Sequence, residues 1–337
     1  MNTTEISGPA PALAPPGETG GGRAAAIKDR LQQLLAFASL IVIGAYFSFA
    51  SPIFFTWDNI TSILFSTVVI GCLAVGTTFV IITGGIDLSI GTGMALCAVM
   101  SGVFIVNLGV PMVLGVVLAI LFGGLVGFVN GFNVAVLRLP PFIATLAMML
   151  VAEGLALVIS DSTPIYFTET PGYVKISTGE LVPGLPNAVL ILLVVCVLAA
   201  LLLGRSVLGR YTYAIGSNEQ ATELSGIRVG RWKIAVYTLA GLFIGLAGVM
   251  ISARLGSAQP ATGMGYELQA IAAVVIGGTS LSGGKGTILG TVIGALIISV
   301  LNNGLQLLSI AQEWQSVILG VVILVAVYAD MARKKEA

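Results

Sequence analysis

Long runs of apolar residues, separated by short polar stretches, recur along most of the chain. Crossing the hydrocarbon core of a bilayer as a helix takes about 20 mainly apolar residues. Ten runs come close to that length, and we expect a membrane-spanning helix at each: roughly residues 31–52, 60–83, 88–107, 110–137, 141–160, 187–204, 234–253, 267–281, 287–309 and 314–330. The pattern predicts an all-α integral membrane protein with about ten transmembrane helices.

The overall composition agrees with this interpretation. Of the 337 residues, 57% are hydrophobic and 9% are charged, and the mean hydropathy is +1.04. A soluble domain carries about 25% charged residues, so this chain has too few to cover a water-facing surface.

The basic residues indicate how the chain is oriented. Lys and Arg concentrate in cytoplasmic loops of membrane proteins. With a cytoplasmic N-terminus and ten crossings, only Lys175 and Arg254 fall outside. The other thirteen fall inside: Arg23, Lys28, Arg30, Arg138, Arg205, Arg210, Arg228, Arg231, Lys233, Lys285, Arg333, Lys334 and Lys335. We therefore expect both termini in the cytoplasm.

Three segments stand apart from the apolar runs. Residues 1–30 are rich in Pro, Gly and Ala, and we expect a disordered cytoplasmic tail ahead of a transmembrane domain over residues 31–337. Residues 161–186 form the expected extracytoplasmic loop. Residues 204–233, with five basic residues, form a long cytoplasmic loop.

Several classes of chemistry are disfavoured. Fifteen basic and fifteen acidic residues cancel, which gives no reason to expect a nucleic-acid partner, and histidine is absent. The three cysteines lie far apart in apolar runs, so no metal or redox pair is indicated. The stretch TSLSGGKGT at 279–287 does not meet the phosphate-binding pattern GxxxxGK[ST]. We expect no cofactor in this chain, and any ATPase would be a separate polypeptide.

Glycines recur at helix-packing intervals. Small residues four positions apart let helices approach closely in a membrane. Three rows have this spacing, and each predicts a helix-packing face or, alternatively, a hinge: Gly123, Gly127 and Gly131; Gly241 and Gly245; Gly286, Gly290 and Gly294.

One short sequence occurs twice. Residues 84–93 read GGIDLSIGTG and residues 277–286 read GGTSLSGGKG, so the leading glycines, the Leu-Ser pair and the later glycines coincide. Glycine-rich breaks at matching places of two halves are typical of transporters built from repeats. Six crossings between the copies predict the same orientation, whereas one miscounted helix would invert them.

A few polar residues interrupt the apolar runs. An acidic residue within a membrane costs roughly 2.5–3.5 kcal/mol on insertion scales and is usually functional. Asp87 lies in the first glycine-rich break, where it lines a polar path or, alternatively, caps the next helix at the surface. The candidate translocation path contains Asp87, Ser89, Asn130, Glu153, Asn302 and Asn303, and Gln306 is a further polar residue in an apolar run.

Four blocks of sequence resemble a known family. They are VGTTFVIITGGIDLSIG at 75–91, LPPFIATLAMM at 139–149, GRYTYAIGSNEQATELSGIRVGRWK at 209–233 and the stretch from Ser257 to Leu308. Together they resemble the membrane permease subunit of bacterial ABC sugar importers, and the ribose importer is the most similar type. The resemblance covers essentially residues 31–337.

The resemblance implies an ABC importer permease fold with internal repeats, in the bacterial inner membrane. It implies a homodimer, two ATP-binding cassettes that hold ATP and Mg, and an extracytoplasmic sugar-binding protein. The cytoplasmic loop would carry a coupling helix that docks on the ATPase, formed by Gly216, Ser217, Asn218, Glu219, Ala221, Thr222, Leu224, Ser225 and Gly226. One departure is Glu153, where the resemblance leads us to expect a basic residue before Gly154.

We therefore expect a transport subunit, not an enzyme, that forms the path for ribose or a similar monosaccharide. Three alternatives remain from the sequence. One is a permease for branched-chain amino acids, which shares the architecture. Another is an ion-coupled secondary transporter, in which Asp87 and Glu153 would be the ion sites. A membrane enzyme is the weakest alternative, because His and a dense carboxylate set are missing.

Overall fold

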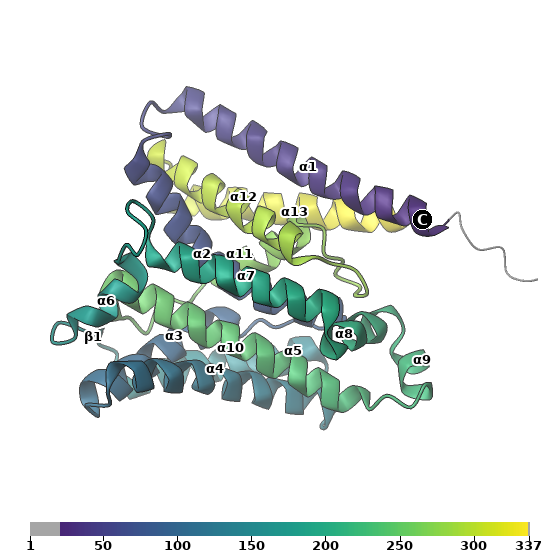
Figure 1. The fold of residues 1–337 in the computed structure, drawn as a ribbon, viewed down its shortest axis with the longest axis horizontal. Helices are drawn as coiled ribbons and strands as arrows, with labels where there is room; N and C mark the ends of the chain where they lie inside the picture. Colours follow the sequence, from purple (N-terminus) through teal and green to yellow (C-terminus); the bar gives the residue numbers. More distant parts are fainter. Residues whose placement is uncertain (1–20, 336–337) are drawn as a thin grey trace, which may run out of the picture.

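The computed structural model describes residues 21–335 and is almost entirely helical (Figure 1). Each of the ten apolar runs coincides with a helix. These helices are α1 (Gly21–Ala50), α2 (Trp57–Ile82), α3 (Ile90–Gly102) continued by the π-helical turn η1 (Val103–Asn107), α4 (Met112–Ala135), α5 (Pro141–Ile159), α7 (Asn187–Arg205), α10 (Val229–Leu255), α11 (Tyr266–Ile276), α12 (Ile288–Leu307) and α13 (Gln312–Lys335).

Within the described residues, seven helices are long and apolar enough to cross a membrane: α2, α3 with η1, α4, α5, α7, α10 and α12. The apolar parts of α1, α11 and α13 are shorter, at Ala36–Ala50, Tyr266–Ile276 and Gln312–Tyr328. The all-α membrane fold is thus confirmed. The count of ten crossings and the cytoplasmic placement of the termini stay predictions.

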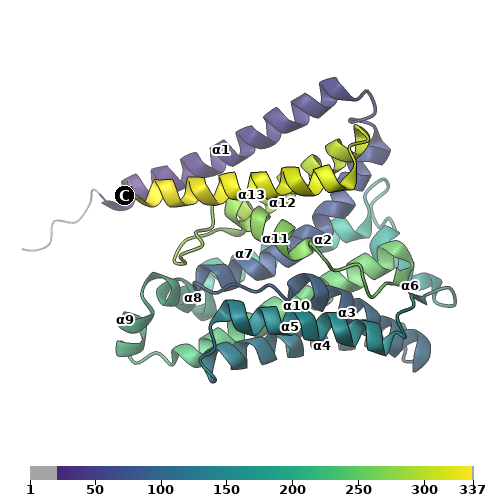
Figure 2. The same ribbon diagram turned by 180° about the vertical axis from the view of Figure 1, so that it is seen from behind.

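The connecting segments gather at two opposite ends of the bundle. One end carries α8 (Val207–Ser217) and α9 (Glu219–Leu224), and we call it the α9 end (Figure 1). The other carries β1 (Ile165–Tyr166), α6 (Pro171–Thr178) and β2 (Ser257–Ala258), and we call it the α6 end. The start of α1 and the end of α13 both lie at the α9 end (Figures 1 and 2).

The expected tail differs from the structure at its last residues. Residues 1–20 lie outside the described residues. Helix α1 begins at Gly21, ahead of the expected start near residue 31. The sequence RAAAIKDR at 23–30 consists mostly of strong helix formers, which explains the earlier start.

The expected extracytoplasmic loop, residues 161–186, folds back on the bundle. Strand β1 pairs antiparallel with β2, which follows α10. The Tyr173 hydroxyl of α6 lies 2.9 Å from the hydroxyl of Ser101 in α3 and 2.7 Å from that of Ser252 in α10. Burial raises the pKa of Tyr173 to about 12, so the hydroxyl remains protonated at physiological pH. These contacts hold the loop on the ends of two central helices.

Two of the glycine rows join α4 to α10. Gly123 faces the backbone of Gly241 and Gly245, and Gly127 faces the Tyr237 carbonyl and Gly241. A Cβ atom at either α4 position would collide with the backbone of α10. The predicted packing face is confirmed for this pair of helices.

The third row packs α12 against α11. Gly290 lies against Gly277, and Gly294 lies against the carbonyl of Ala273. Because these contacts are between backbones, α11 and α12 approach as closely as helices can.

The two glycine-rich breaks meet at the α9 end, where Gly84 lies beside Gly283. The Gly284 backbone N–H donates to the carbonyl oxygen of Ile82 at 2.8 Å. Helices α2 and α11 both end there and α12 leads away from it, whereas α3 begins deeper in the bundle, where Gly91 lies beside Gly263 and Glu267. The Thr78 and Thr291 hydroxyls, 2.7 Å apart, fix the antiparallel contact of α2 with α12. The two copies therefore have the same orientation in the bundle.

Candidate functional site

Three of the six expected path residues form one buried cluster. Oδ1 of Asp87 accepts hydrogen bonds from the Ser89 backbone N–H at 2.9 Å and from the Ser89 hydroxyl at 2.7 Å. The Asn130 side-chain amide, on α4, donates to the Ser89 hydroxyl at 2.8 Å and lies 3.4 Å from Oδ2 of Asp87. All three residues are 0% exposed. The cluster therefore ties the first glycine-rich break to α4.

This geometry bears on the two interpretations of Asp87. A cap at the protein surface would be solvated, whereas Asp87 is fully buried. The Asp87 carboxylate does accept the backbone N–H of Ser89, just before α3 begins. Asp87 thus orders the start of α3 from inside the bundle.

The asparagines at positions 302 and 303 lie elsewhere, in the wall of a cavity of about 570 Å³ near the α6 end. The Asn302 amide donates to Oε1 of Gln269 at 3.1 Å, and the Asn303 amide donates to Oδ1 of Asn59 at 2.8 Å. Hydroxyl and amide groups from α2, α11, α12, α13 and the segment before α11 complete the polar wall: Ser66, Thr262, Tyr266, Gln306, Gln312, Gln315 and Ser316.

Glu153 belongs to neither group. It lies half-buried on α5, between the exposed side chains of Leu150 and Leu155. Its carboxylate has no hydrogen-bond or ion-pair partner within the described residues. Gly154 beside it has open space where a side chain would be.

The expected coupling segment forms two short helices, α8 and α9. The Asn218 side chain caps α9 by accepting a hydrogen bond from the Ala221 backbone N–H at 2.9 Å. Glu219 occupies the first turn of α9, where a negative charge is favoured by the helix dipole. Gly226, with φ 82°, turns the chain away just after α9 ends. The helix expected here is present.

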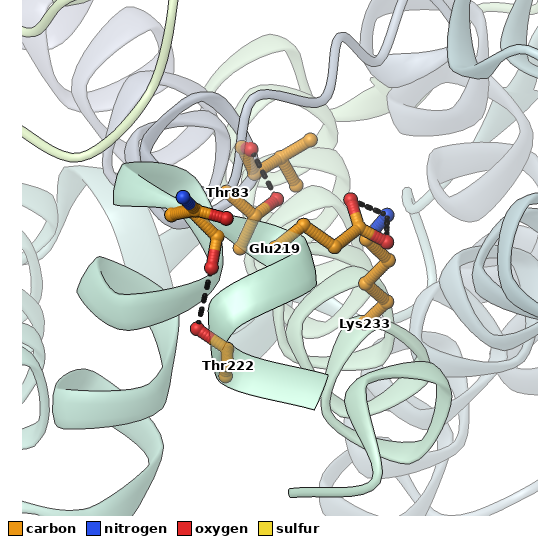
Figure 3. Close-up of polar contacts among 6 residues, drawn as sticks. Thr83, Glu219, Thr222 and Lys233 are labelled. Atoms are coloured by element: carbon orange, nitrogen blue, oxygen red, sulfur yellow. Dashed lines mark hydrogen bonds and ion pairs between the residues drawn. The ribbon is translucent and has the colours of Figure 1, made fainter. Parts of the chain in front are cut away.

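An ion pair holds α9 to the start of α10. The Lys233 ammonium lies 2.7 Å from Oε1 of Glu219, and the two side chains are 18% and 50% exposed. Figure 3 shows this pair together with Thr83, which follows α2, and Thr222, whose hydroxyl donates to the Asn218 carbonyl. Glu219 and Lys233 border a cavity of about 210 Å³ that reaches Thr83.

Helix α8 contacts the second glycine-rich break and the end of α2. The Tyr213 hydroxyl donates to the Gly286 carbonyl at 2.7 Å. Gly216 packs against the Ile82 carbonyl and against the backbone N of Gly284, leaving no space for a side chain. The coupling segment is therefore joined directly to the second repeated segment and to the end of α2, which leads into the first.

Comparison with known proteins supports the predicted family. The family model described as "Branched-chain amino acid transport system / permease component" matches residues 59–327. The ribose import permease of Escherichia coli strain K12 is 46% identical over 318 residues, which cover 93% of this chain and 98% of that protein. The chain belongs to this family of import permeases.

Other relatives extend the comparison. The ribose import permease of Bacillus subtilis strain 168 is 45% identical, with 91% of this chain and 94% of that protein covered. The xylose transport system permease of Escherichia coli strain K12 is 32% identical, and the match covers 95% of this chain and 96% of that protein. No solved structure matches the chain. The resemblance noted in the sequence is thus confirmed at the level of the family.

Sequence reasoning missed several residues of this permease. Gln269, Gln312 and Gln315 line the polar cavity, yet they lie close to the ends of apolar runs, where glutamine is unremarkable. The contact of Tyr213 with Gly286 joins positions far apart in the chain, and no local pattern signals it. For Lys233, the sequence indicates only a contribution to the positive charge of the loop at residues 204–233, and it does not predict the ion pair with Glu219.

Proposed function

We propose that this permease forms the translocation pathway of an ATP-driven importer of ribose or a similar monosaccharide in the bacterial inner membrane. Its relatives named for ribose import match almost from end to end at 44–46% identity. The relative named for xylose transport, another pentose, matches at 32%. The gradation favours ribose, or a sugar close to it, as the substrate.

The observation that carries the ATP-driven mechanism is the exposure of α9. Among its six residues only Thr222 is buried, and Leu224 is 89% exposed at the tip of the bundle. A helix this short is marginally stable alone, and an exposed leucine gains about 1.5–3 kcal/mol when fully buried. An ATP-binding subunit that covers α9 would supply both stabilisation and a site for ATP and Mg.

Basic residues at the α9 end indicate how the permease is oriented in the membrane. Arg210, Arg228, Arg231, Lys233 and Lys285 all belong to segments at the α9 end. Cytoplasmic loops are enriched in such residues, so we place the α9 end in the cytoplasm and the α6 end outside, where a sugar-binding protein would deliver substrate.

A second copy of the permease would complete the pathway. Helices α5, α11 and α13 lie on one face of the bundle (Figure 2). Glu153 on α5 has no partner within the described residues, and a charged group facing lipid is costly. We infer that Glu153 faces the pore or the second copy. The permease itself performs no covalent step.

Reconstitution tests this function. The permease, its ATP-binding subunit and its sugar-binding protein are placed in proteoliposomes, and uptake of labelled ribose is measured with and without ATP. We expect uptake that requires ATP and persists when an ionophore collapses the proton gradient. Uptake that continues without ATP and stops with the ionophore would instead identify an ion-coupled transporter.

A second candidate substrate comes from the description of the family model, which names branched-chain amino acids. The same proteoliposomes distinguish it. Excess unlabelled leucine is expected to leave ribose uptake unchanged, and labelled leucine is expected to stay outside. Accumulation of leucine instead of ribose would reassign the permease to amino acids.

A further inference from the structure

The cavity near the α6 end has an unusual chemical character for a membrane protein. Six carboxamide side chains contribute to its wall: Gln269, Asn302, Asn303, Gln306, Gln312 and Gln315. Four residues with hydroxyl groups join them, Ser66, Thr262, Tyr266 and Ser316, whereas no carboxylate, ammonium or guanidinium lines it. The wall is thus strongly polar and carries no formal charge at neutral pH.

Such a wall is not suited to contact with lipid. An unsatisfied polar group in hydrocarbon costs several kcal/mol. Six amides gathered at one place therefore require water, a polar solute or protein against them. Non-helical backbone also lines the cavity at residues 261–264, ahead of α11. Backbone of this kind is tolerated at membrane depth where it borders a water-filled space or is buried in protein.

Part of the hydrogen-bonding capacity of the wall is unused. Oδ1 of Asn303 is buried without a partner. The side chains of Gln306 and Gln312 make no hydrogen bond within the described residues. A carboxamide offers two donor hydrogens and an acceptor oxygen. These groups are therefore available to a solute that both donates and accepts hydrogen bonds at several points.

We propose that this cavity is a contact site for a neutral polyhydroxylated solute, a monosaccharide, on its way from the α6 end into the permease. Each sugar hydroxyl is a donor and an acceptor, which complements carboxamides. An amino-acid zwitterion would present a carboxylate and an ammonium, and no side chain of the wall carries an opposite charge. The proposal rests on the proposed function and adds to it the residues that touch the sugar.

The size of the cavity agrees with this role. Its volume of about 570 Å³ falls within the range of about 300–1,000 Å³ that is common for small-molecule sites. A monosaccharide would share this space with water, and its hydroxyls would exchange water for amide partners as it moves. Such a site binds weakly, as a pathway requires, because tight binding would stop release.

The test uses the complete transporter in proteoliposomes. The variants are Gln306→Leu, Gln312→Leu and the double variant, which keep side-chain size and remove the hydrogen bonds. The matched control is Asn107→Leu, because Asn107 is an exposed carboxamide of η1 that does not line the cavity. ATP-dependent ribose uptake is measured at limiting sugar, with co-purification of the ATP-binding subunit and basal ATP hydrolysis measured in parallel.

We expect each single variant to lower uptake about two- to tenfold, the effect of losing one or two ordinary hydrogen bonds, and the double variant to lower it further. Co-purification and basal ATP hydrolysis should stay at the parental level, as should uptake by Asn107→Leu. Parental uptake in both single variants and in the double variant would overturn the assignment of this cavity. Equal loss in Asn107→Leu would do so too, because the effect would not be specific to the cavity.

A separate outcome addresses the proposed function. If the parental transporter imports no monosaccharide with ATP, the function is wrong, whatever the variants do. If the parental transporter imports ribose and the cavity variants do too, the function stands and only the site is wrong.

Discussion

The hydroxyl of Tyr213 in α8 donates a hydrogen bond to the Gly286 carbonyl at 2.7 Å. This bond joins the segment that we expect to move with the ATPase to the second glycine-rich break, which leads into α12. Asn302 and Asn303 lie near the other end of α12, in the wall of the polar cavity. One helix thus runs from the α9 end to the proposed sugar site.

Removing this hydroxyl should weaken transmission without unfolding the protein. In Tyr213→Phe the ring remains and one hydrogen bond of about 0.5–1.5 kcal/mol is lost. We expect ATP hydrolysis to continue, while the number of sugar molecules imported per ATP falls severalfold. The measurement compares ribose uptake with phosphate release in the same proteoliposomes.

Tyr211→Phe is the matched control for this variant. Tyr211 also lies in α8, and its ring packs against Trp232 at 4.8 Å between centroids. Its hydroxyl has no hydrogen-bond partner within the described residues. An equal decrease in both variants, or none in either, would count against a specific role for the bond between Tyr213 and Gly286.

Exchanging the charges of Glu219 and Lys233 tests whether their ion pair is needed for transport. An exposed pair contributes only about 0.2–1 kcal/mol, but it fixes α9 relative to α10. Glu219→Arg places two positive charges together at a helix N-terminus, so we expect a clear loss of ribose uptake. The double variant Glu219→Lys with Lys233→Glu should recover much of the uptake if the pair itself matters. Failure to recover would indicate that Glu219 acts through a contact with the ATPase.

Asp87→Asn is expected to reduce uptake and to lower the free energy of unfolding. The Asn130 amide and the Ser89 hydroxyl both donate to the Asp87 carboxylate. The new carboxamide would point N–H donors at one of these groups, so that two donors would face each other. A mismatch among buried polar groups costs about 1–3 kcal/mol. Thermal unfolding in detergent and ribose uptake are measured together, and the variant should still reach the membrane. Parental behaviour in both measurements would show that the cluster is not required.

The packing of α4 on α10 can be tested at Gly127. A Cβ atom there would collide with the Tyr237 carbonyl. Gly127→Ala should therefore lower the free energy of unfolding by about 1–3 kcal/mol, because the helices must separate. Gly44→Ala is the control, since nothing lies within 4 Å of that position, and alanine stabilises a helix by about 0.5–1 kcal/mol over glycine. Similar melting temperatures for the two variants would contradict the close backbone contact.

Much of the fold follows from sequence because lipid imposes a simple requirement on length and polarity. Each apolar run became a helix, and the glycines at intervals of four mark real contacts between α4 and α10 and between α11 and α12. The cap at Asn218 and the turn at Gly226 were also predictable, since both depend on neighbours within a few residues.

The candidate site was less predictable because it depends on which helices meet. Asp87, Asn302 and Glu153 look alike in sequence, as polar residues in apolar surroundings. The structure places them in a buried cluster, in a cavity wall and on a partly exposed helix face. Only the packing of α11, α12 and α13 brings the carboxamides of the cavity together, and no spacing along one helix encodes that.

The exposed leucine of α9 gives the most direct test of ATPase docking. Leu224 is 89% exposed at the α9 end, whereas Leu181 is 83% exposed near the α6 end, so the two form a matched pair. If an ATP-binding subunit covers α9, Leu224→Ser removes about 1.5–3 kcal/mol of burial, equivalent to roughly ten- to a hundredfold weaker association. Co-purification with the ATP-binding subunit should fall in Leu224→Ser and stay unchanged in Leu181→Ser. Because Leu224 contributes little to packing within the permease, the amount of protein in the membrane should be equal for both variants. Equal co-purification of the two would show that the ATPase docks elsewhere and that α9 is only a connector.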